Sequence, residues 1–99
     1  MSKYLLSNKS VDDLTNIWNY IFDFWWETQA DRYYNNLLFY CQEIAENTDL
    51  GRNYREVDIR IFGFKVEQHI IFYQILNKDE IKIVRILHSK MDLKSRIQE

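Results

Sequence analysis

A change of hydrophobic period near residue 50 is the feature that most constrains the fold. Before that point, apolar residues recur every three or four positions, which is the pattern of amphipathic helices. The first stripe comprises Val11, Leu14, Ile17, Trp18, Ile21, Phe22 and Trp25. The second comprises Ala30, Tyr33, Tyr34, Leu37, Leu38, Cys41, Ile44 and Ala45. Only a short break around Thr28 separates the stripes, so we expect two helices that pack antiparallel.

Polar residues and a glycine mark the expected helix ends. Ser10, with Asp13 three positions later, predicts the N-cap of the first helix, and Thr28 begins the second in the same way. Gly51 can adopt the positive φ that often follows the last turn of a helix, so we expect it to close the second. Ahead of the helices, residues 3–7 predict a short strand at or near a sheet edge.

After the helices the pattern changes to alternation, with many β-branched residues. Residues 57–62 alternate and predict a half-buried strand, with Gly63 at the turn that follows. Residues 68–76 are almost continuously apolar, as expected of a central strand covered on both faces. The polar triplet 77–79 predicts a hairpin turn, after which residues 80–88 form the last strand.

These elements predict an α+β fold formed by one domain, residues 1–99. An N-terminal strand is followed by an antiparallel two-helix hairpin packed on a small, mostly antiparallel sheet, in the order β-α-α-β-β-β, with a short C-terminal helix or turn. On the last strand we expect one face to carry Ile81, Ile83, Arg85 and Leu87, and the other to carry Lys82, Val84, Ile86 and His88.

Both faces of this sheet are largely apolar, but two helices can cover only one of them fully. Apolar surface left in water costs about 25 cal/mol per Å², so an uncovered face favours a bound protein partner. The alternatives are that the C-terminal segment folds over this face or that two copies of the chain meet there. Aromatic residues make up 16% of the chain, which also indicates that some rings lie on a surface meant for a partner.

The charge is distributed unevenly along the chain. Residues 1–50 carry three basic and eight acidic side chains, a net of −5, whereas residues 51–99 carry ten basic and seven acidic ones, a net of +3. The total of −2 argues against a general nucleic-acid-binding protein, which needs a dense basic face to displace counterions from phosphates. The C-terminal half has enough positive charge for a local patch, but we expect no direct sequence-specific binding of nucleic acid.

Cysteine and histidine usage predicts neither a metal site nor a cofactor. Cys41 is the single cysteine, and no pair or quartet of cysteine and histidine has the spacing of a zinc site. We expect Cys41 to be a small buried hydrophobe, because it lies on the apolar stripe of the second helix. No apolar run is long enough for a signal peptide or a bilayer span, so we expect a cytoplasmic protein that does not enter the membrane.

The C-terminal segment carries the most specific pattern, I-L-H-x-x-M-D-L-x-x-R-I from Ile86 to Ile97. It resembles the C-terminal segment of ParE toxins, the toxin halves of bacterial type II toxin–antitoxin pairs in the RelE/ParE superfamily. Further similar segments, in the order of the family, are Ala30–Tyr34 at the start of the second helix, Leu50–Arg52 with Tyr54–Val57 before the second strand, and Glu67–Gln74 in the central strand.

The resemblance implies a toxin that inhibits DNA gyrase by protein–protein contact, stalls it on cleaved DNA, and is neutralised by a ParD-like antitoxin. It implies no catalysis by the chain itself. The residues expected to contact the target and to carry toxicity are His88, Met91, Asp92 and Arg96. The residues expected to contact the antitoxin are Trp18, Ile21 and Trp25.

The alternative is a RelE-like endoribonuclease that cleaves messenger RNA on the ribosome. Cleavage through the 2′-hydroxyl needs a base, a cation and an acid. The best available set is Arg60, Arg85 and His88, with Glu56 as a conceivable base, but Arg85 and His88 alternate to opposite faces of an ideal strand. A third hypothesis is an interaction module that has the toxin fold but lacks the activity.

Overall fold

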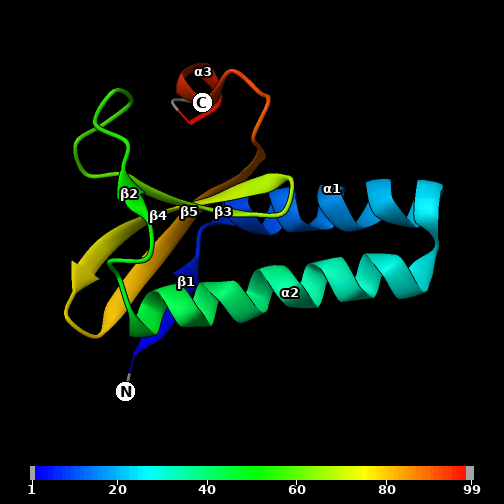
Figure 1. Cartoon of the computed structure of the whole chain (residues 1–99), viewed down its shortest axis with the longest axis horizontal. Helices are drawn as coiled ribbons and strands as arrows, with labels where there is room; N and C mark the ends of the chain where they lie inside the picture. Colours follow the sequence, from blue (N-terminus) through cyan, green and yellow to red (C-terminus); the bar gives the residue numbers. More distant parts are fainter. Residues whose placement is uncertain (1, 98–99) are drawn as a thin grey trace.

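A computed structural model describes residues 2–97 of the chain (Figure 1). The elements in chain order are β1 (Lys3–Leu6), α1 (Asn8–Trp25), α2 (Glu27–Glu46), β2 (Arg52–Asn53), β3 (Phe62–Val66), β4 (His69–Asn77), β5 (Glu80–His88) and α3 (Leu93–Ile97). The strands form one sheet in the order β1-β5-β4-β3-β2, in which β1 is parallel to β5 and every other pair is antiparallel. This arrangement confirms the predicted α+β fold, with one strand more than expected.

The predicted half-buried strand at residues 57–62 is wrong over residues 57–61, because this segment forms successive turns. The backbone N–H groups of Val57 and Asp58 donate to the carbonyl of Tyr54, and the Asp58 carboxylate accepts from the N–H of Arg60 at 2.8 Å. Such local bonds satisfy the backbone without a neighbouring strand. The strand begins later, at Phe62, so Gly63 lies within β3 and not at a turn.

The predicted helix ends are also corrected. Ser7 caps α1 instead of Ser10: its hydroxyl oxygen accepts from the backbone N–H of Ser10 at 3.0 Å, while Ser10 itself is fully buried inside the helix. Similarly, α2 begins at Glu27, before Thr28. Gly51 has no positive φ. A glycine is needed there for space, because a Cβ would lie 2.5 Å from the hydroxyl oxygen of Tyr73.

The helical hairpin covers one face of the sheet and forms the larger core. Its buried members are Leu14, Ile17, Ile21, Ala30, Tyr33, Leu37, Cys41, Ile44 and Ala45 of the helices, and Val66, Ile71, Tyr73, Ile81, Ile83 and Ile86 of the sheet. Cys41 is fully buried, as expected, and burial raises the pKa of its thiol to about 12, so this thiol remains protonated.

A β-bulge changes which side chains of β5 face this core. Phe72 pairs with Arg85 and Tyr73 with Ile83, so Val84 is the extra residue of β5. The predicted alternation is therefore wrong beyond this point. Arg85 no longer shares the face of Ile83, because the bulge moves it away from the hairpin core.

The opposite face of the sheet is covered by the chain itself. Its buried core consists of Ile61, Ile70, Phe72 and Leu87, against which Tyr54, Val84, Leu93 and Ile97 pack. In Figure 1, α3 and the loop before β3 lie on this side of the sheet, away from the hairpin. The expectation that a partner must cover this face is therefore wrong over the centre of the sheet. Leu93 and Ile97 anchor the C-terminal segment, while Met91 remains 42% exposed.

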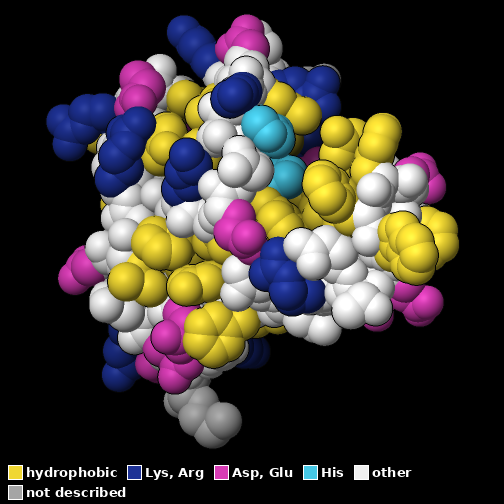
Figure 2. All heavy atoms as spheres, turned by 45° about the vertical axis from the view of Figure 1, so that its right-hand side comes forward, with side chains coloured by type: hydrophobic (Ala, Val, Ile, Leu, Met, Phe, Trp, Pro, Cys, Tyr) yellow, Lys and Arg dark blue, Asp and Glu magenta, His cyan; other side chains and the backbone are white. Residues whose placement is uncertain are grey.

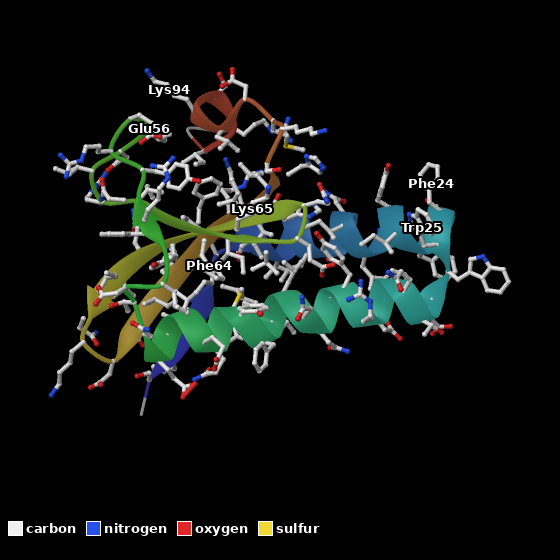
Figure 3. All side chains as sticks on the ribbon, viewed as in Figure 1. Phe24, Trp25, Glu56, Phe64, Lys65 and Lys94 are labelled. Atoms are coloured by element: carbon white, nitrogen blue, oxygen red, sulfur yellow. The ribbon has the colours of Figure 1, made fainter. Side chains whose placement is uncertain are left out.

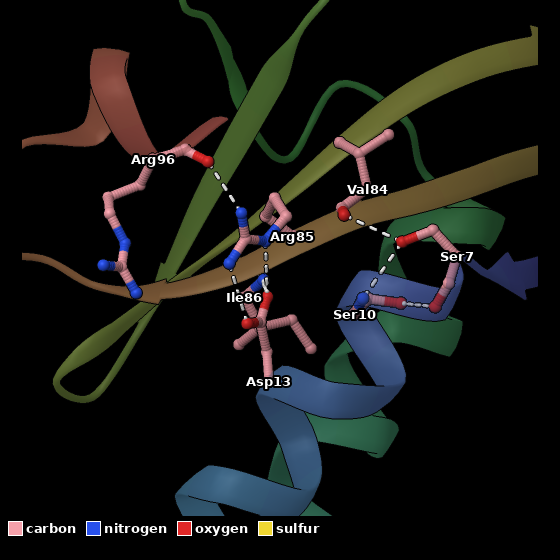
Figure 4. A network of polar contacts seen from close by, with 7 residues as sticks. All are labelled: Ser7, Ser10, Asp13, Val84, Arg85, Ile86 and Arg96. Carbon is pink, nitrogen blue, oxygen red and sulfur yellow. Dashed lines mark hydrogen bonds and ion pairs between the residues drawn. The ribbon is translucent and has the colours of Figure 1, made fainter. Parts of the chain in front are cut away.

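Asp13 of α1 and Arg85 of β5 join the helical hairpin to the sheet, at the part of the β5 edge that β1 does not cover (Figure 4). β1 ends at Leu6, and beyond it the Asp13 carboxylate accepts from the backbone N–H of Ile86 at 2.9 Å. The same carboxylate accepts from Nε and Nη2 of Arg85 at 2.9 and 3.0 Å. Arg85 Nη1 donates to the backbone carbonyl of Arg96 at 2.6 Å. One buried guanidinium therefore links α1, β5 and α3.

Replacing Asp13 by alanine should lower the free energy of unfolding by about 3–5 kcal/mol, because it leaves a buried guanidinium without its counter-charge. Urea denaturation measures this loss. Asp12→Ala is the matched control, since Asp12 is an exposed neighbour on the same helix turn. Equal losses in the two variants would show that the ion pair does not stabilise the fold.

Candidate protein-interaction site

The four most exposed aromatic side chains of residues 2–97 lie at the end of the helical hairpin that is farthest from the sheet. Tyr20, Phe24, Trp25 and Trp26 are 63%, 65%, 66% and 80% exposed. Figure 3 shows Phe24 and Trp25 at this end, and Figure 2 shows hydrophobic side chains gathered there. Large aromatic side chains are seldom left in water in such a group, and they commonly anchor protein–protein contacts. We call these four residues the aromatic tip.

Trp26 joins the two helices in a strained conformation. Its φ of 88° and ψ of 169° place it in a backbone region that is occupied almost only by glycine, at a cost of about 1–3 kcal/mol. The N–H of Trp26 donates to the carbonyl of Phe22 at 3.1 Å, and its carbonyl accepts from Ala30 at 3.0 Å. Since the indole is mostly exposed, it recovers little of this cost by packing. A large side chain at this position therefore does not serve the stability of the hairpin.

A groove runs from the aromatic tip along α1. It consists of two neighbouring cavities of about 360 and 500 Å³ that share Tyr20, Ile21, His69 and His88. The smaller cavity is completed by Trp25, Gln29, Arg32, Tyr33, Glu67 and Gln68, and the larger one by Asn16, Ile17, Lys90 and Met91. Figure 2 shows both histidines at the surface, beside the hydrophobic side chains of this face. The groove is thus mainly apolar, with polar groups at its floor and ends.

The two histidines form the floor of the groove and are held by defined hydrogen bonds. The Tyr33 hydroxyl accepts from the backbone N–H of Gln68 at 3.1 Å and lies 2.7 Å from Nδ1 of His69. The hydroxyl and Nδ1 share a hydrogen bond whose direction depends on the tautomer of His69. Nδ1 of His88 accepts from the N–H of Lys90 at 3.1 Å, and the two imidazole centroids are 5.3 Å apart.

Burial lowers the pKa of His69 from 6.5 to about 4, with a further contribution from the neighbouring His88. The imidazole of His69 is therefore uncharged near neutral pH. It offers the groove an uncharged polar ring beside apolar walls. Such a group suits the polar atoms of a bound protein segment.

The turn between β3 and β4 forms the opposite wall. Glu67 has a positive φ of 54°, and its carboxylate is held by α2, accepting from the Asn36 amide at 3.1 Å and lying 3.5 Å from the Arg32 guanidinium. Both ends of this ion pair are partly exposed, so its contribution to stability is small. Its role is to fix the position of the turn relative to the hairpin.

Of the residues expected to contact an antitoxin, the structure brings two to the groove. Ile21 lines both cavities, and Trp25 lines the smaller one. Trp18 lines neither: its ring stacks on Phe22 at 5.0 Å, and its indole N–H donates to Asp31 of α2 at 2.9 Å. Trp18 therefore contributes to the contact between the two helices.

The residues expected to contact the target also divide into two groups. His88 and Met91 line the larger cavity and are accessible there. Asp92 caps α3, accepting from the backbone N–H and the hydroxyl of Ser95 at 3.4 and 2.9 Å. Arg96 provides the carbonyl that binds Arg85. The second pair therefore holds α3 in place.

The residues of the nuclease alternative are not brought to one cavity. Arg60 is exposed in the loop and pairs with Asp58 at 3.0 Å, whereas Arg85 is buried against Asp13. His88 lies in the groove, and neither arginine is among the residues that line it. Glu56 is exposed and pairs with Arg52 at 2.9 Å, and this hydrogen bond lowers the pKa of its carboxyl.

Neither His69 nor Tyr33 was predicted as a member of the site. The signal for His69 was available: with Lys78 and Asp79 as the hairpin turn, antiparallel pairing puts His69 opposite His88, as observed. Tyr33 had no comparable signal, because its hydroxyl reaches the groove only once α2 is docked on the sheet.

Two further classes of site are not found among residues 2–97. No helix there is long and apolar enough to cross a membrane. In the same part of the chain, no group of three histidine, cysteine, aspartate or glutamate side chains is placed to hold a metal ion. The fold and the groove therefore define a small α+β protein with an exposed surface suited to another protein.

Comparison with known proteins identifies the family. Residues 4–93 match the model of the family described as "ParE toxin of type II toxin-antitoxin system, parDE". The proteins named Toxin ParE1 from two Mycobacterium tuberculosis strains, CDC 1551 and H37Rv, are each 32% identical over 92 residues, covering 93% of this chain and 94% of theirs. A solved structure described as "Chromosomal ParDE TA system from P. aeruginosa" contains a chain that superposes with a TM-score of 0.76 at 14% identity, covering 89% of this chain and 96% of that one.

The match over nearly the whole chain places this protein among the toxins of type II toxin–antitoxin systems. The chain belongs to the ParE toxin family.

Replacing Trp26 by glycine should raise the free energy of unfolding by about 1 kcal/mol or more, because glycine relieves the backbone strain and the exposed indole loses few contacts. Trp25→Gly is the control, since Trp25 ends α1 and glycine there should destabilise the helix. Chemical denaturation of both variants measures the effect. A loss of stability in Trp26→Gly would mean that the strain is compensated by packing.

The low pKa of His69 should make the folded state less stable in acid. Between pH 6.5 and pH 4 the unfolded chain binds a proton that the folded imidazole does not, so stability falls as the pH falls through this range. For a partly exposed ring we expect about 1–2 kcal/mol, after allowance for solvent screening. Urea denaturation of the wild type and of His69→Gln at both pH values isolates this effect, because the carboxylates titrate in both proteins. The same pH dependence of the free energy of unfolding in both proteins would contradict this contribution of His69.

Proposed function

We propose that this toxin inhibits DNA gyrase by protein–protein contact and is neutralised by a ParD-like antitoxin. The observation that carries the proposal is the exposed aromatic tip together with the apolar groove that continues from it. Family membership supports the choice of both partners. The separation of Arg60, Arg85 and His88 favours a contact mechanism over RNA cleavage.

The antitoxin is expected to bind over the aromatic tip and the smaller cavity. Trp25 and Tyr20 provide large, rigid apolar area, which carries most of the affinity in many protein interfaces. Ile21 lies deeper, where an apolar side chain of the antitoxin could reach it. The relative from P. aeruginosa was solved as a ParDE toxin–antitoxin system, which is consistent with this pairing.

The target is expected to bind at the other end of the groove, over His88 and Met91 and the adjoining α3. Both cavities contain His88, so an antitoxin segment that fills the groove would cover part of the target surface. Neutralisation would then follow from direct competition for the same surface. Asp92 and Arg96 would act indirectly in this scheme, by holding α3 in position.

A supercoiling assay with purified gyrase tests the target. The wild type should inhibit supercoiling and trap cleaved DNA, and Met91→Ala should weaken inhibition about tenfold, because an exposed anchor is lost. Leu76→Ala is the control, since Leu76 is 46% exposed at the β4–β5 turn, away from the groove. Ribosome-dependent transcript cleavage without gyrase inhibition would contradict the proposal. Deletion of residues 91–99 is not a suitable test of the target surface. Leu93 and Ile97 of α3 pack on the core that contains Phe72 and Leu87, so the deletion would also expose this core.

A binding measurement tests the antitoxin. The binding partner in this experiment is the ribbon-helix-helix protein that we expect the neighbouring reading frame to encode. Trp25→Ala should weaken its binding by about 30-fold or more, the effect of losing an interface hot spot of about 2 kcal/mol. Phe39→Ala is the matched control, because Phe39 is 56% exposed on α2 and does not line the groove. Equal affinity of Trp25→Ala and wild type would place the antitoxin elsewhere.

A further inference from the structure

Charge is segregated between the two sides of the folded chain. The helical hairpin, residues 8–46, carries two basic and seven acidic side chains, a net of −5. Residues 52–66 carry four basic and two acidic ones, and residues 82–97 carry five basic and one acidic one. These two segments are distant in sequence but pack together on the side of the sheet away from the hairpin, through Tyr54 and Ile61 with Leu93 and Ile97. The net charge of −2 therefore conceals a basic face.

The lysines of the strands in these segments point to that side. Lys65 of β3 pairs with Ile70, whose side chain belongs to the core beneath α3. Lys82 lies between Ile81 and Ile83, which face the hairpin, so its own side chain faces the other way. Figure 3 shows Lys65 and Lys94 on the α3 side of the sheet. Figure 2 shows lysine and arginine side chains gathered in the same region.

Most acidic side chains of this face are already engaged. Glu56 pairs with Arg52, Asp58 pairs with Arg60, and Asp92 caps α3. Four further exposed cations of these segments, Arg55, Lys65, Lys82 and Lys94, have no acidic partner within residues 2–97. We call these four residues the basic face. Its positive charge is therefore available to an external anion.

The basic face lacks the anchors of a protein interface. Ile61, Ile70, Phe72 and Leu87 beneath it are at most 5% exposed, in contrast to the aromatic tip. The only large apolar side chains of residues 52–66 and 82–97 that are clearly exposed in the described chain are Ile59 and Met91. Exposed charge without exposed aromatic rings suits a polyanion better than a folded protein partner.

We propose that the basic face binds the phosphate backbone of duplex DNA through charge, without reading the base sequence. Duplex DNA carries one negative charge per about 1.7 Å of its axis, so several separated cations can each neutralise a phosphate. The aromatic tip and the smaller cavity lie on the hairpin side of the sheet (Figure 3), which leaves them available to the antitoxin while DNA is bound. The choice of DNA over RNA rests on the proposed gyrase target.

Fluorescence anisotropy with a short labelled DNA duplex of arbitrary sequence tests the proposal. Lys65→Gln/Lys94→Gln should weaken binding about tenfold and reduce the slope of log affinity against log salt by about two, the value for two lost phosphate contacts. Lys82→Gln should add to the loss. The matched control is Lys9→Gln/Lys78→Gln, which removes two exposed lysines outside the basic face, one on α1 and one at the β4–β5 turn, and should leave affinity nearly unchanged. Unfolding midpoints verify that all variants are folded.

Three results would overturn the proposal: equal weakening by both double variants, no binding by the wild type at low salt, or tighter binding of polyglutamate or of an RNA duplex than of DNA. The assay contains no gyrase, so its outcome is independent of the proposed target. A toxin that inhibits gyrase but does not bind DNA would refute this inference alone. Conversely, DNA binding that depends on Lys65 and Lys94 without gyrase inhibition would refute only the proposed function.

Discussion

The buried ion pair between Asp13 and Arg85 is the interaction on which the rest of the structure depends. β1 is too short to cover the whole edge of β5, and the Asp13 carboxylate occupies the next position by accepting from the backbone N–H of Ile86. The same carboxylate orients Arg85, whose Nη1 donates to the carbonyl of Arg96. Taking both charges out of water is expensive, so the pair is stable only with all these hydrogen bonds in place. It thereby fixes the hairpin, the sheet edge and α3 relative to one another.

This coupling also determines which surfaces are available to partners. With Leu93 and Ile97 of α3 packed on the core that contains Phe72 and Leu87, the centre of the sheet is buried on both faces. The four most exposed aromatic side chains of the described residues are those of the aromatic tip. The tip lies on an acidic hairpin, whereas the side of the sheet beneath α3 is basic. A small toxin can thus present two chemically different surfaces, one with aromatic anchors and one with charge alone. Trp26 supports this view of the tip, because it retains a large exposed side chain at a strained position.

Much of the candidate site could be predicted from particular residues, and the failures have identifiable causes. Ile21 and Trp25 were predicted from the apolar stripe of α1, and both line the groove. Trp18 belongs to the same stripe but faces α2, because a stripe of about 100° is wide enough to contact two neighbours. The face of Arg85 could not be predicted, since a β-bulge reverses the alternation and has no clear mark in the sequence. The short turns after Tyr54 were mistaken for a strand because the alternation of residues 57–61 is equally compatible with local turns closed by Asp58.

The sequence by itself determined the two amphipathic helices, the hairpin turn between the last two strands and the membership of the ParE family, because these depend on local periodicity and on short patterns of residues. Only the tertiary structure decided that α3 covers the second face of the sheet, that His69 and His88 meet at the floor of a groove, and that the basic residues of two distant segments share one face. The physical reason is that these features depend on contacts between segments far apart in the chain. Their free energy comes from burial and from the buried ion pair between Asp13 and Arg85, and neither is encoded in local periodicity.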